Sequence, residues 1–538
     1  MLTRIAGGRV IDPANHRDAI GDIWMRDGGI VAPPPGGKAA ESFDASGKIV
    51  MAGAIDIHSH IAGTNVNTAR LLLPEQQRTA TPLAEAGWST FATGCRYAEM
   101  GFTTVVEPAV APHHALHAHL ELADIPIIDK ATLCVLGNDD YLLRLLQTGE
   151  GAGAVRDYVA WSLAGARGLG IKVINAGGAA AFKENVRAFS LDDVVPSYGV
   201  SSRAIVKALQ AAVHELGVPH PLHVHCNNLG LAGNADTALA TIEAAEGLPL
   251  HLAHLQFYGY GRDGERGFSS AAARLAEAVN ANKNITVDVG QVMFGQTVTI
   301  SLDTLRQFNA RHQARPRKWV IFDGDANGAG IVPYEYRRND FYNALQWAVG
   351  LELFLLIDDP ARVFFTTDHP NGAPFTAYPD IFALLMSREL RAEWIAQLPA
   401  AAMALTTLPS IRREYTLPEI ATMTRAAPAR LLGLADRGHL APGAVADVAV
   451  YEDAPDRARM FRSAALVFKD GELVVRDGAV VNVRYGRALT VAPGHDAAIE
   501  RRLQAYYDQR YGLSPDRFSV PDWAIGRPEP FEQVPCRS

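Results

Sequence analysis

The chain has 538 residues, of which 48% are hydrophobic and 20% are charged. This composition supplies a large apolar core and excludes a disordered or low-complexity chain. Lys and Arg total 50 against 58 Asp and Glu, so the net charge is −8. A mildly acidic chain without a basic run excludes the positive surface that nucleic acid or an anionic membrane requires.

Three features of the sequence indicate the cellular location: the N-terminus, the apolar runs and the cysteines. The N-terminus lacks an apolar stretch of signal-peptide length, and the longest apolar run, residues 351–357, is too short to span a bilayer. Cysteines that form no CxxC pair argue against a disulfide framework or an iron–sulfur cluster and fit a reducing compartment. We therefore expect a soluble cytoplasmic protein. The four cysteines are Cys95, Cys134, Cys226 and Cys536.

Both ends of the chain predict short β-strands. Residues 1–48 contain alternating apolar runs around the turn signal Asp27-Gly28, and residues 438–486 repeat this pattern around Asp470-Gly471. We predict that the two segments form one small β-sandwich; two unrelated β appendages are the alternative. A C-terminal extension follows over residues 487–538, with a helix expected at residues 496–511.

Residues 49–437 alternate between strand-like and helix-like stretches, as a parallel α/β architecture requires. Eight strands separated by helices, such as residues 204–216 and 271–282, match a (β/α)₈ barrel of the TIM type. The largest insertion spans residues 294–343. The candidate strands are residues 49–57, 103–107, 126–136, 171–175, 222–225, 249–255, 285–289 and 363–367.

A His-x-His element ends the first candidate strand. In Ile55-Asp56-Ile57-His58-Ser59-His60, the two histidines are two residues apart, so they lie on the same face of an extended chain. The carboxyl end of a barrel strand opens toward the mouth where such barrels keep their active sites. Two imidazoles at that point can bind a metal such as Zn²⁺. We predict His58 and His60 as metal ligands.

Two later strands also end in histidine. His225 ends the strand at residues 222–225 and His254 lies at the end of the strand at residues 249–255, and we predict both as ligands. His223 shares a face with His225 but lies deeper, so we expect it to support the site. His251 lies at the strand entrance and is a weaker candidate for a ligand.

An aspartate and a lysine complete the predicted set. Asp368 follows an apolar strand and precedes a loop, which favours a catalytic carboxylate over a helix cap. Lys172 lies inside an apolar strand, where burial lowers the pKa of an amine and leaves part of it neutral. A neutral amine can add CO₂ and become a carbamate that bridges two metals. The alternative for Lys172 is an ion pair with a buried acid.

The order His-x-His, Lys, His, His, Asp on strands one, four, five, six and eight resembles the amidohydrolase superfamily in its binuclear form. This resemblance implies two divalent metal ions, with Zn²⁺ expected, and a carboxylated Lys172. The segment from Gly438 to Asp447 resembles the point where chains of that superfamily re-enter the β-sandwich.

Further stretches are similar to a narrower family, the A-type subunits of formylmethanofuran dehydrogenases and formyltransferase/hydrolase complexes. The similarity covers nearly the full chain, and its most specific parts are Glu107-Pro108-Ala109 and the HCNNLG stretch from His225 to Gly230. It implies hydrolysis of an N-formyl amide on a methanofuran-type carrier to formate and amine, in the one-carbon metabolism of methylotrophs. It also implies partner subunits, one of them a formyltransferase.

In that reaction Asp368 would exchange the proton between water and the leaving amine, and His225 or His254 would bind the metal beside the developing oxyanion. Asn227 and Asn228 are candidates for hydrogen bonds to substrate, and a turn role is the equal alternative. Two other enzymes keep the same ligands: a dihydropyrimidinase- or hydantoinase-like cyclic amide hydrolase, and a formylmethanofuran dehydrogenase component working in the CO₂-reducing direction. The HCNNLG stretch, the insertion and the tail favour the formyl-carrier reaction.

Overall fold

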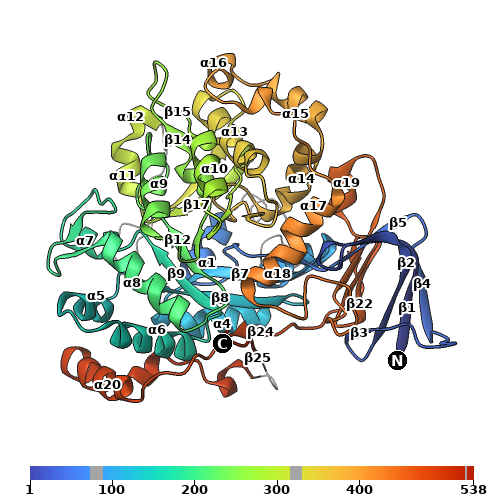
Figure 1. Ribbon diagram of the computed structural model, residues 1–538, viewed down its shortest axis with the longest axis horizontal. Coiled ribbons are helices and arrows are strands. Elements are labelled where there is room, and N and C mark those ends of the chain that lie inside the picture. The colour runs from blue at the N-terminus through green and yellow to red at the C-terminus, as the bar shows by residue number, and fades with distance from the viewer. Residues whose placement is uncertain (73–88, 315–329, 527–529, 538) are drawn as a thin grey trace.

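Eight parallel strands, part of a ten-stranded sheet, curl together at the centre of the molecule. The computed structural model describes residues 1–72, 89–314, 330–526 and 530–537 (Figure 1). A parallel bridge between Ser59 and His369 joins the ends of the first and last strands. This arrangement confirms the predicted (β/α)₈ barrel. The strands in spatial order are β6 (Ala54–Asp56), β7 (Phe102–Val110), β8 (Asp129–Leu136), β9 (Gly170–Ile174), β12 (Leu222–His225), β13 (Leu250–Leu252), β16 (Ile285–Asp288) and β19 (Val363–Phe364).

Helices follow the strands and cover the outside of the barrel. In α8 (Ser202–Glu215), the side chain of Ser201 caps the first turn, and Ile205, Leu209 and Val213 form the buried face at helical spacing. The other helices that accompany the barrel strands include α3 (Thr90–Glu99), α4 (Ala115–Asp124), α6 (Ala152–Ala166), α9 (Ala235–Ala244), α10 (Ala272–Ala281), α13 (Phe341–Leu356) and α14 (Tyr378–Met386).

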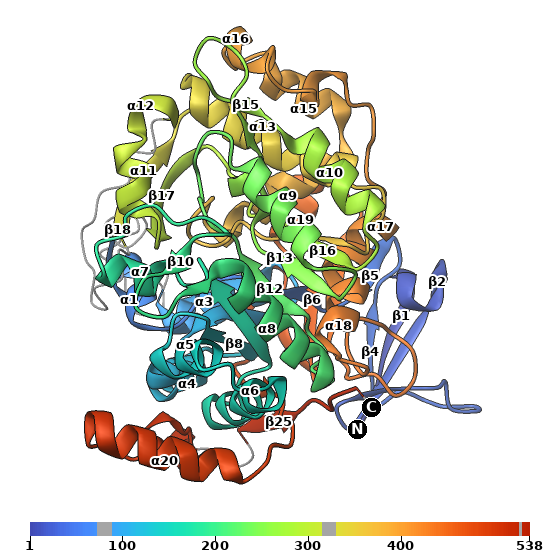
Figure 2. The ribbon, with the colours of Figure 1, turned by 60° about the vertical axis from the view of Figure 1, so that its left-hand side comes forward.

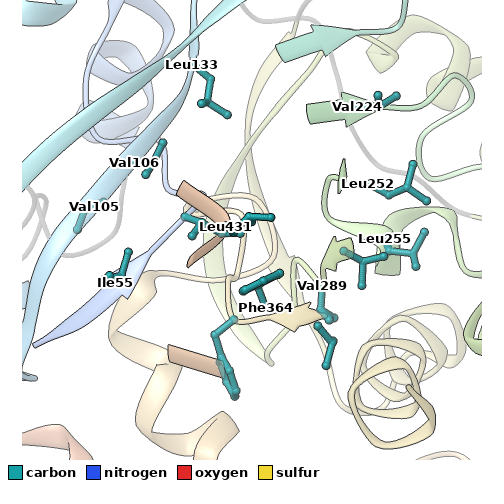
Figure 3. Packing of buried hydrophobic residues seen from close by; sticks show 14 of the residues in the cluster. Ile55, Val105, Val106, Leu133, Val224, Leu252, Leu255, Val289, Phe364 and Leu431 are labelled. Carbon is teal, nitrogen blue, oxygen red and sulfur yellow. The ribbon is translucent and has the colours of Figure 1, made fainter. Parts of the chain in front are cut away.

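Apolar side chains of neighbouring strands pack into one continuous core (Figure 3). Val224, Leu252 and Phe364 lie on three of the barrel strands and are at most 1% exposed. Burying a side chain of this size contributes about 1.5–3 kcal/mol, so the barrel holds the strand ends, and the polar residues on them, in fixed positions.

Strands from both ends of the chain form one hydrogen-bonded sheet beside the barrel (Figure 1). The predicted association of the two ends is present, but as a single nine-stranded sheet. Strand β1 pairs with β4 through its first half and with β5 through its second, and its pairing with β2 shifts between Ile5 and Gly8. Strand β1 thus changes partners along its length, and the apolar side chains of this sheet form a hydrophobic cluster separate from that of the barrel. The strands are β1 (Leu2–Asp12), β2 (Arg17–Arg26), β3 (Gly29–Val31), β4 (Glu41–Asp44), β5 (Lys48–Ala52), β20 (Val448–Glu452), β21 (Leu466–Lys469), β22 (Glu472–Arg476) and β23 (Ala479–Val480).

The predicted first strand at residues 49–57 is wrong as a single element. Its first part, β5, pairs with β20 of the flanking sheet, and its second part, β6, enters the barrel. Gly53 separates them, and a Cβ atom there would lie 2.1 Å from Thr103 Oγ1. The close approach of the chain to Thr103 explains why the strand changes sheets at a glycine.

The C-terminal extension packs on the barrel. Strands β24 (Ala488–Thr490) and β25 (Phe531–Gln533) run parallel to the start of β8, and α20 (Ala498–Tyr511) lies along α6 (Figure 2). In the insertion, β17 (Gly295–Ser301) and β18 (Gly330–Tyr336) form an antiparallel pair, and residues 315–329 lie outside the described part. Among the described residues, no helix has the length and apolar character needed to cross a bilayer.

Candidate metal centre

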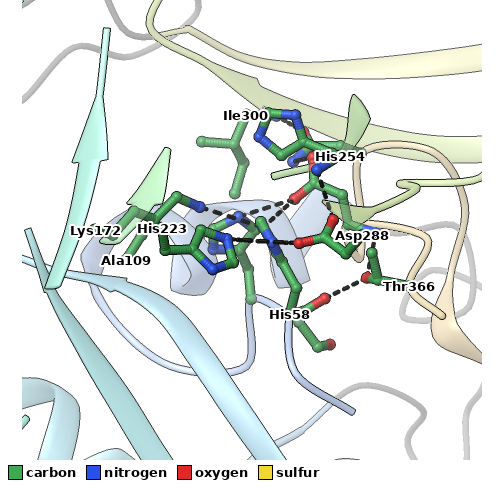
Figure 4. A network of polar contacts seen from close by, with 12 residues as sticks. His58, Ala109, Lys172, His223, His254, Asp288, Ile300 and Thr366 are labelled. Atoms are coloured by element: carbon green, nitrogen blue, oxygen red, sulfur yellow. Dashed lines mark hydrogen bonds and ion pairs between the residues drawn. The ribbon is translucent and has the colours of Figure 1, made fainter. Parts of the chain in front are cut away.

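The structure brings the six predicted ligands together at the carboxyl side of the barrel strands, and Figure 4 shows three of them, His58, Lys172 and His254. They come from strands that are far apart in sequence, and all except His60 are buried. His60 is partly exposed and lines the cavity above the centre. The six are His58 and His60 after β6, Lys172 in β9, His225 at the end of β12, His254 after β13 and Asp368 after β19.

Asp368 lies at the middle of this group. Its Oδ1 atom is 3.1 Å from His58 Nε2 and 3.2 Å from His60 Nε2. The side-chain amide of Asn371 donates to the other oxygen at 2.9 Å, which fixes the carboxylate. Asp368 itself has φ 52°, in the left-handed region that strains a residue with a side chain.

Lys172, His225 and His254 complete the group of six residues around Asp368. Lys172 Nζ is 3.3 Å from His58 Nε2. The ring of His254 lies 5.3 Å from that of His58 and 4.7 Å from that of His225. His58, His254 and Asp368 each offer a donor atom within 4.8 Å of the others, a spacing that one metal ion can bridge.

Burial and neighbouring carboxylates set the protonation of Lys172 and His60. Burial lowers the pKa of Lys172, and the charges of Asp368, Asp288 and Glu107 oppose this shift. Burial also works against the protonated form of His60, but its contacts with the carboxylates of Asp368 and Glu107 outweigh burial and raise the pKa of His60 to about 9. A proton on His60 would therefore compete with a metal ion for the same ring nitrogen.

Asp368 stays ionised. Burial alone would raise its pKa, but the charge of His254 and the close contacts of His58 and His60 hold the pKa of Asp368 well below its usual range. An ionised carboxylate is the form that binds a metal or accepts a proton from water.

Three carboxylates in contact with the predicted ligands were not predicted. Glu107 is 3.1 Å from His60 Nδ1, Asp288 is 3.0 Å from His58 Nδ1, and Asp303 is 3.5 Å from His225 Nε2. Glu107 and Asp288 lie at or near the ends of predicted strands, so the strand-end signal that identified the ligands could have identified them as well. Asp303 precedes α11 (Thr304–Asn309) in the insertion, where the sequence gives no comparable signal.

The deeper histidines support the centre from below. His223 Nε2 is 3.0 Å from His58 Nδ1, and His251 Nε2 is 3.0 Å from Asp288 Oδ2. His58, His223 and Asp288 also offer three donor atoms within 4.8 Å. Because these atoms lie close to hydrogen-bond distance from one another, the contacts between them account for this second group.

Asn227 and Asn228 do not reach the cavity. The amide of Asn227 donates to Asn175 Oδ1 at 2.7 Å, and that of Asn228 donates to Thr237 Oγ1 at 3.0 Å. Both are buried, and neither is among the residues that line the cavity. These contacts favour the turn role, and hydrogen bonds from these two side chains to substrate stay a prediction.

A cavity of about 190 Å³ opens above the six residues. Its floor contains His60, Lys172, His225, His254 and Asp368, and its wall is mainly apolar, with Val66, Val110, Ile174, Leu229, Phe257 and Ile300. Asn371, Ser301 and His114 add polar groups. A mostly apolar pocket with a few converging polar groups is typical of a site for a small organic substrate.

The donor set fits divalent metal ions. Asp368 Oδ1, His225 Nε2 and His254 Nδ1 are buried at the centre, yet none makes a well-directed hydrogen bond within the described part of the chain. A buried polar atom without a partner is costly unless another group satisfies it. The surrounding carboxylates, Glu107, Asp288, Asp303 and Asp368, add buried negative charge that cations would balance.

Comparisons with known proteins agree with this geometry. An amidohydrolase family profile matches residues 41–482. The Fhc A component of the formyltransferase/hydrolase complex of Methylorubrum extorquens is 55% identical over the full length of both chains, and protein FwdA of Methanocaldococcus jannaschii is 39% identical over 90% of each. The chain therefore belongs to the amidohydrolase family, whose members typically bind metals.

Solved structures extend the comparison. One chain of the crystal structure of the formyltransferase/hydrolase complex FhcABCD from Methylorubrum extorquens, in complex with methylofuran, matches with a TM-score of 0.94 and 54% identity, covering 100% of both chains. N-acyl-D-glutamate deacylase from Bordetella bronchiseptica matches with a TM-score of 0.50 at 18% identity, over 89% of this chain and 98% of that one. The second likeness shows the shared fold alone.

Proposed function

We propose that the protein is a metal-dependent hydrolase that cleaves the N-formyl amide of a methylofuran-type carrier to formate and free amine. It acts as the Fhc A component of a complex that also contains a formyltransferase. The observation that carries the proposal is the convergence of Asp368 Oδ1 with His58 Nε2 and His60 Nε2 beside Lys172, in a chain 55% identical throughout to the Fhc A component. The proposal places the protein in the cytoplasm, in keeping with its free cysteines.

The proposed ligands of two divalent metals, with Zn²⁺ expected, are the four histidines, Asp368 and a carboxylated Lys172. Burial lowers the pKa of Lys172, which favours the neutral amine that adds CO₂. A carbamate on Lys172 would supply two oxygen atoms as metal ligands. When bound, the metals would polarise the formyl carbonyl and lower the pKa of a water molecule.

Asp368 is the proposed acid–base group. Its ionised carboxylate removes a proton from the water that attacks the formyl carbon and returns this proton to the departing amine nitrogen. Asn371 holds the second carboxylate oxygen, so that Oδ1 keeps its direction toward the floor of the cavity. The histidines His225 and His254 flank the side of the floor where the carbonyl oxygen would gain negative charge.

The cavity fits a formyl amide carried by an apolar body. Val110, Ile174 and Phe257 give its wall an apolar surface, while the polar groups gather at the floor. A flat aromatic ring on the carrier would bury its faces against this wall, and the amide would reach the floor. The apolar contacts would exclude bulk water from the reacting carbon and strengthen the electrostatic interactions there.

The observations favour this reaction over the alternatives. FwdA of Methanocaldococcus jannaschii is less similar than the Fhc A component, at 39% against 55% identity. Dihydroorotases match over short segments of 59 and 62 residues, and a dihydropyrimidinase from Brevibacillus agri is 14% identical with a TM-score of 0.50. The short matches cover only 11% of this chain, and the structural likeness shows the fold alone.

The test measures formate release from an N-formylated furfurylamine-type carrier, together with metal content per chain. We expect two metals per chain and turnover for the wild type. Lys172→Ala should lose turnover by at least about 100-fold and regain part of its metal binding when a short carboxylate is supplied. Equal activity of Lys172→Ala and wild type would contradict the carbamate, and hydrolysis of a cyclic amide in place of the formyl carrier would contradict the substrate.

A further inference from the structure

Asp288 occupies the carboxyl end of β16, between β13 and β19 of the barrel (Figure 4). Its side chain is fully buried beneath the proposed metal centre and does not line the cavity. Both oxygens of the Asp288 carboxylate have hydrogen-bond partners: Oδ2 contacts His58 and His251, and Oδ1 accepts from the backbone N–H of His254.

One oxygen of Asp288 orients the ring of His58. The Oδ2 atom lies 3.0 Å from His58 Nδ1, and an ionised carboxylate at that distance favours the tautomer with the ring proton on Nδ1. In that tautomer Nε2 offers its lone pair to a metal ion held between it and Asp368 Oδ1, which lies 3.1 Å away. A carboxylate behind an imidazole in this way fixes both the tautomer and the orientation of a metal ligand.

The other oxygen supports the backbone that carries His254. Asp288 Oδ1 accepts from the backbone N–H of His254 at 2.5 Å. His254 has φ 34°, in the left-handed region, and follows the end of β13 at Leu252. A non-glycine residue in that conformation costs about 1–2 kcal/mol, so a neighbouring group has to stabilise it. Gly290 leaves space for the turn, because a Cβ atom there would lie 2.5 Å from His254 Cβ.

His251 prevents Asp288 from rotating. Its Nε2 atom is 3.0 Å from the same Oδ2 atom, and its Nδ1 atom is 2.9 Å from Thr286 Oγ1. Two histidines share one oxygen of the carboxylate, and a backbone N–H donates to the other. Both oxygens therefore have hydrogen-bond partners. An amide offers one acceptor oxygen in place of two, so an asparagine here cannot reproduce these contacts in either orientation.

We propose that Asp288 is a positioning residue that holds two ligands of the metal centre at once, the ring of His58 and the backbone of His254. This inference rests on the proposed metal centre. The seventh barrel strand contributes no proposed ligand. In this inference it fixes the distance between the ligands from strands one and six.

The experiment compares the full-length wild type with Asp288→Asn after metal removal. Zn²⁺ affinity is measured by competition with a chromophoric chelator, and the electronic absorption spectrum is recorded after Co²⁺ loading. We expect Asp288→Asn to bind metal about 10–100-fold more weakly and to show an altered Co²⁺ spectrum. Far-UV circular dichroism of the metal-free proteins checks that the fold is kept.

Glu352→Gln is the matched control, since Glu352 is a fully buried carboxylate of α13 that accepts from Thr407 and Ser270 and does not line the metal cavity. This variant should lose stability yet keep wild-type affinity and spectrum. Wild-type affinity and spectrum in Asp288→Asn, or a wild type that binds no divalent metal, would overturn the role of Asp288. A wild type that binds metal tightly but releases no formate would overturn the proposed function and leave the role of Asp288 standing.

Discussion

Two of the groups of buried carboxylates in this molecule differ in what faces the negative charge. At the metal centre, Asp288 and Asp368 face imidazoles. In a second group, here called the joint cluster, Asp129 of β8 is 3.1 Å from Lys469 of β21 and 3.1 Å from Arg437. The joint cluster consists of Asp129, Arg437, Asp447, Lys469 and Glu532, and it connects the barrel, the flanking sheet and β25.

The joint cluster contains its own cations. Arg437 contacts Asp129 and holds Glu532 with two nitrogens at 2.8 and 3.0 Å, and Lys469 contacts Asp129 and Asp447. Within the described residues, one atom of the joint cluster, Asp447 Oδ2, lacks a well-directed hydrogen bond, whereas at the proposed metal centre three ligand atoms of three different residues lack one. Buried charge alone therefore does not mark a functional site; buried charge without sufficient positive partners does.

The largest expected effect comes from removing the proposed acid–base carboxylate. Asp368→Asn should lower kcat for formate release by about 10²–10⁴-fold, because the amide cannot accept the proton from water. The matching change in the joint cluster, Asp129→Asn, should leave kcat of the folded protein within about twofold, because Asp129 lies outside the proposed site. Comparable losses in both variants would show that kcat responds to buried charge in general.

For stability we expect the opposite order, with the larger effect in the joint cluster. Asp129→Asn should lower the free energy of unfolding by about 3–5 kcal/mol, because Arg437 and Lys469 would be left buried without full compensation. Urea unfolding with circular dichroism measures the change. Metal content per chain, determined on the same samples, should stay at the wild-type value. A variant as stable as the wild type would contradict the structural role of the joint cluster.

The smallest expected effect concerns pH. Burial would raise the pKa of Asp129, but the charges of Lys469 and Arg437 lower it below its usual range. Its contribution to stability is therefore fully present above about pH 4, the value for an unfolded aspartate, and is lost as the pH falls toward the lower folded pKa.

Consequently the difference in unfolding free energy between wild type and Asp129→Asn should be constant from about pH 5 to about pH 7 and shrink below about pH 4, by up to about 1.4 kcal/mol per pH unit. Urea titrations at several pH values measure it. A difference that grows on acidification would show that the folded pKa of Asp129 lies above its usual value.

The local pattern of the sequence was enough to predict the barrel and to locate the six proposed ligands. His58 and His60 share a face because strand side chains alternate, and the strand ends of a parallel barrel meet at one rim. The same rule failed for residues 49–57, where the change of sheets at Gly53 depends on contact with Thr103, 50 residues later in the chain. Nor could it predict that the amides of Asn227 and Asn228 contact Asn175 and Thr237, because these partners lie outside their own stretch.

The sequence by itself therefore determined which side chains reach the rim of the barrel, because alternation and apolar runs are properties of neighbouring residues. The tertiary structure alone decided which of those side chains face the cavity and which support them. Asp288 and Asp368 both lie at the ends of apolar strands, yet one lies behind His58 and the other in front of it. The positions of the two carboxylates relative to His58 depend on how strands far apart in the chain curl and pair. A local sequence pattern does not contain this long-range packing.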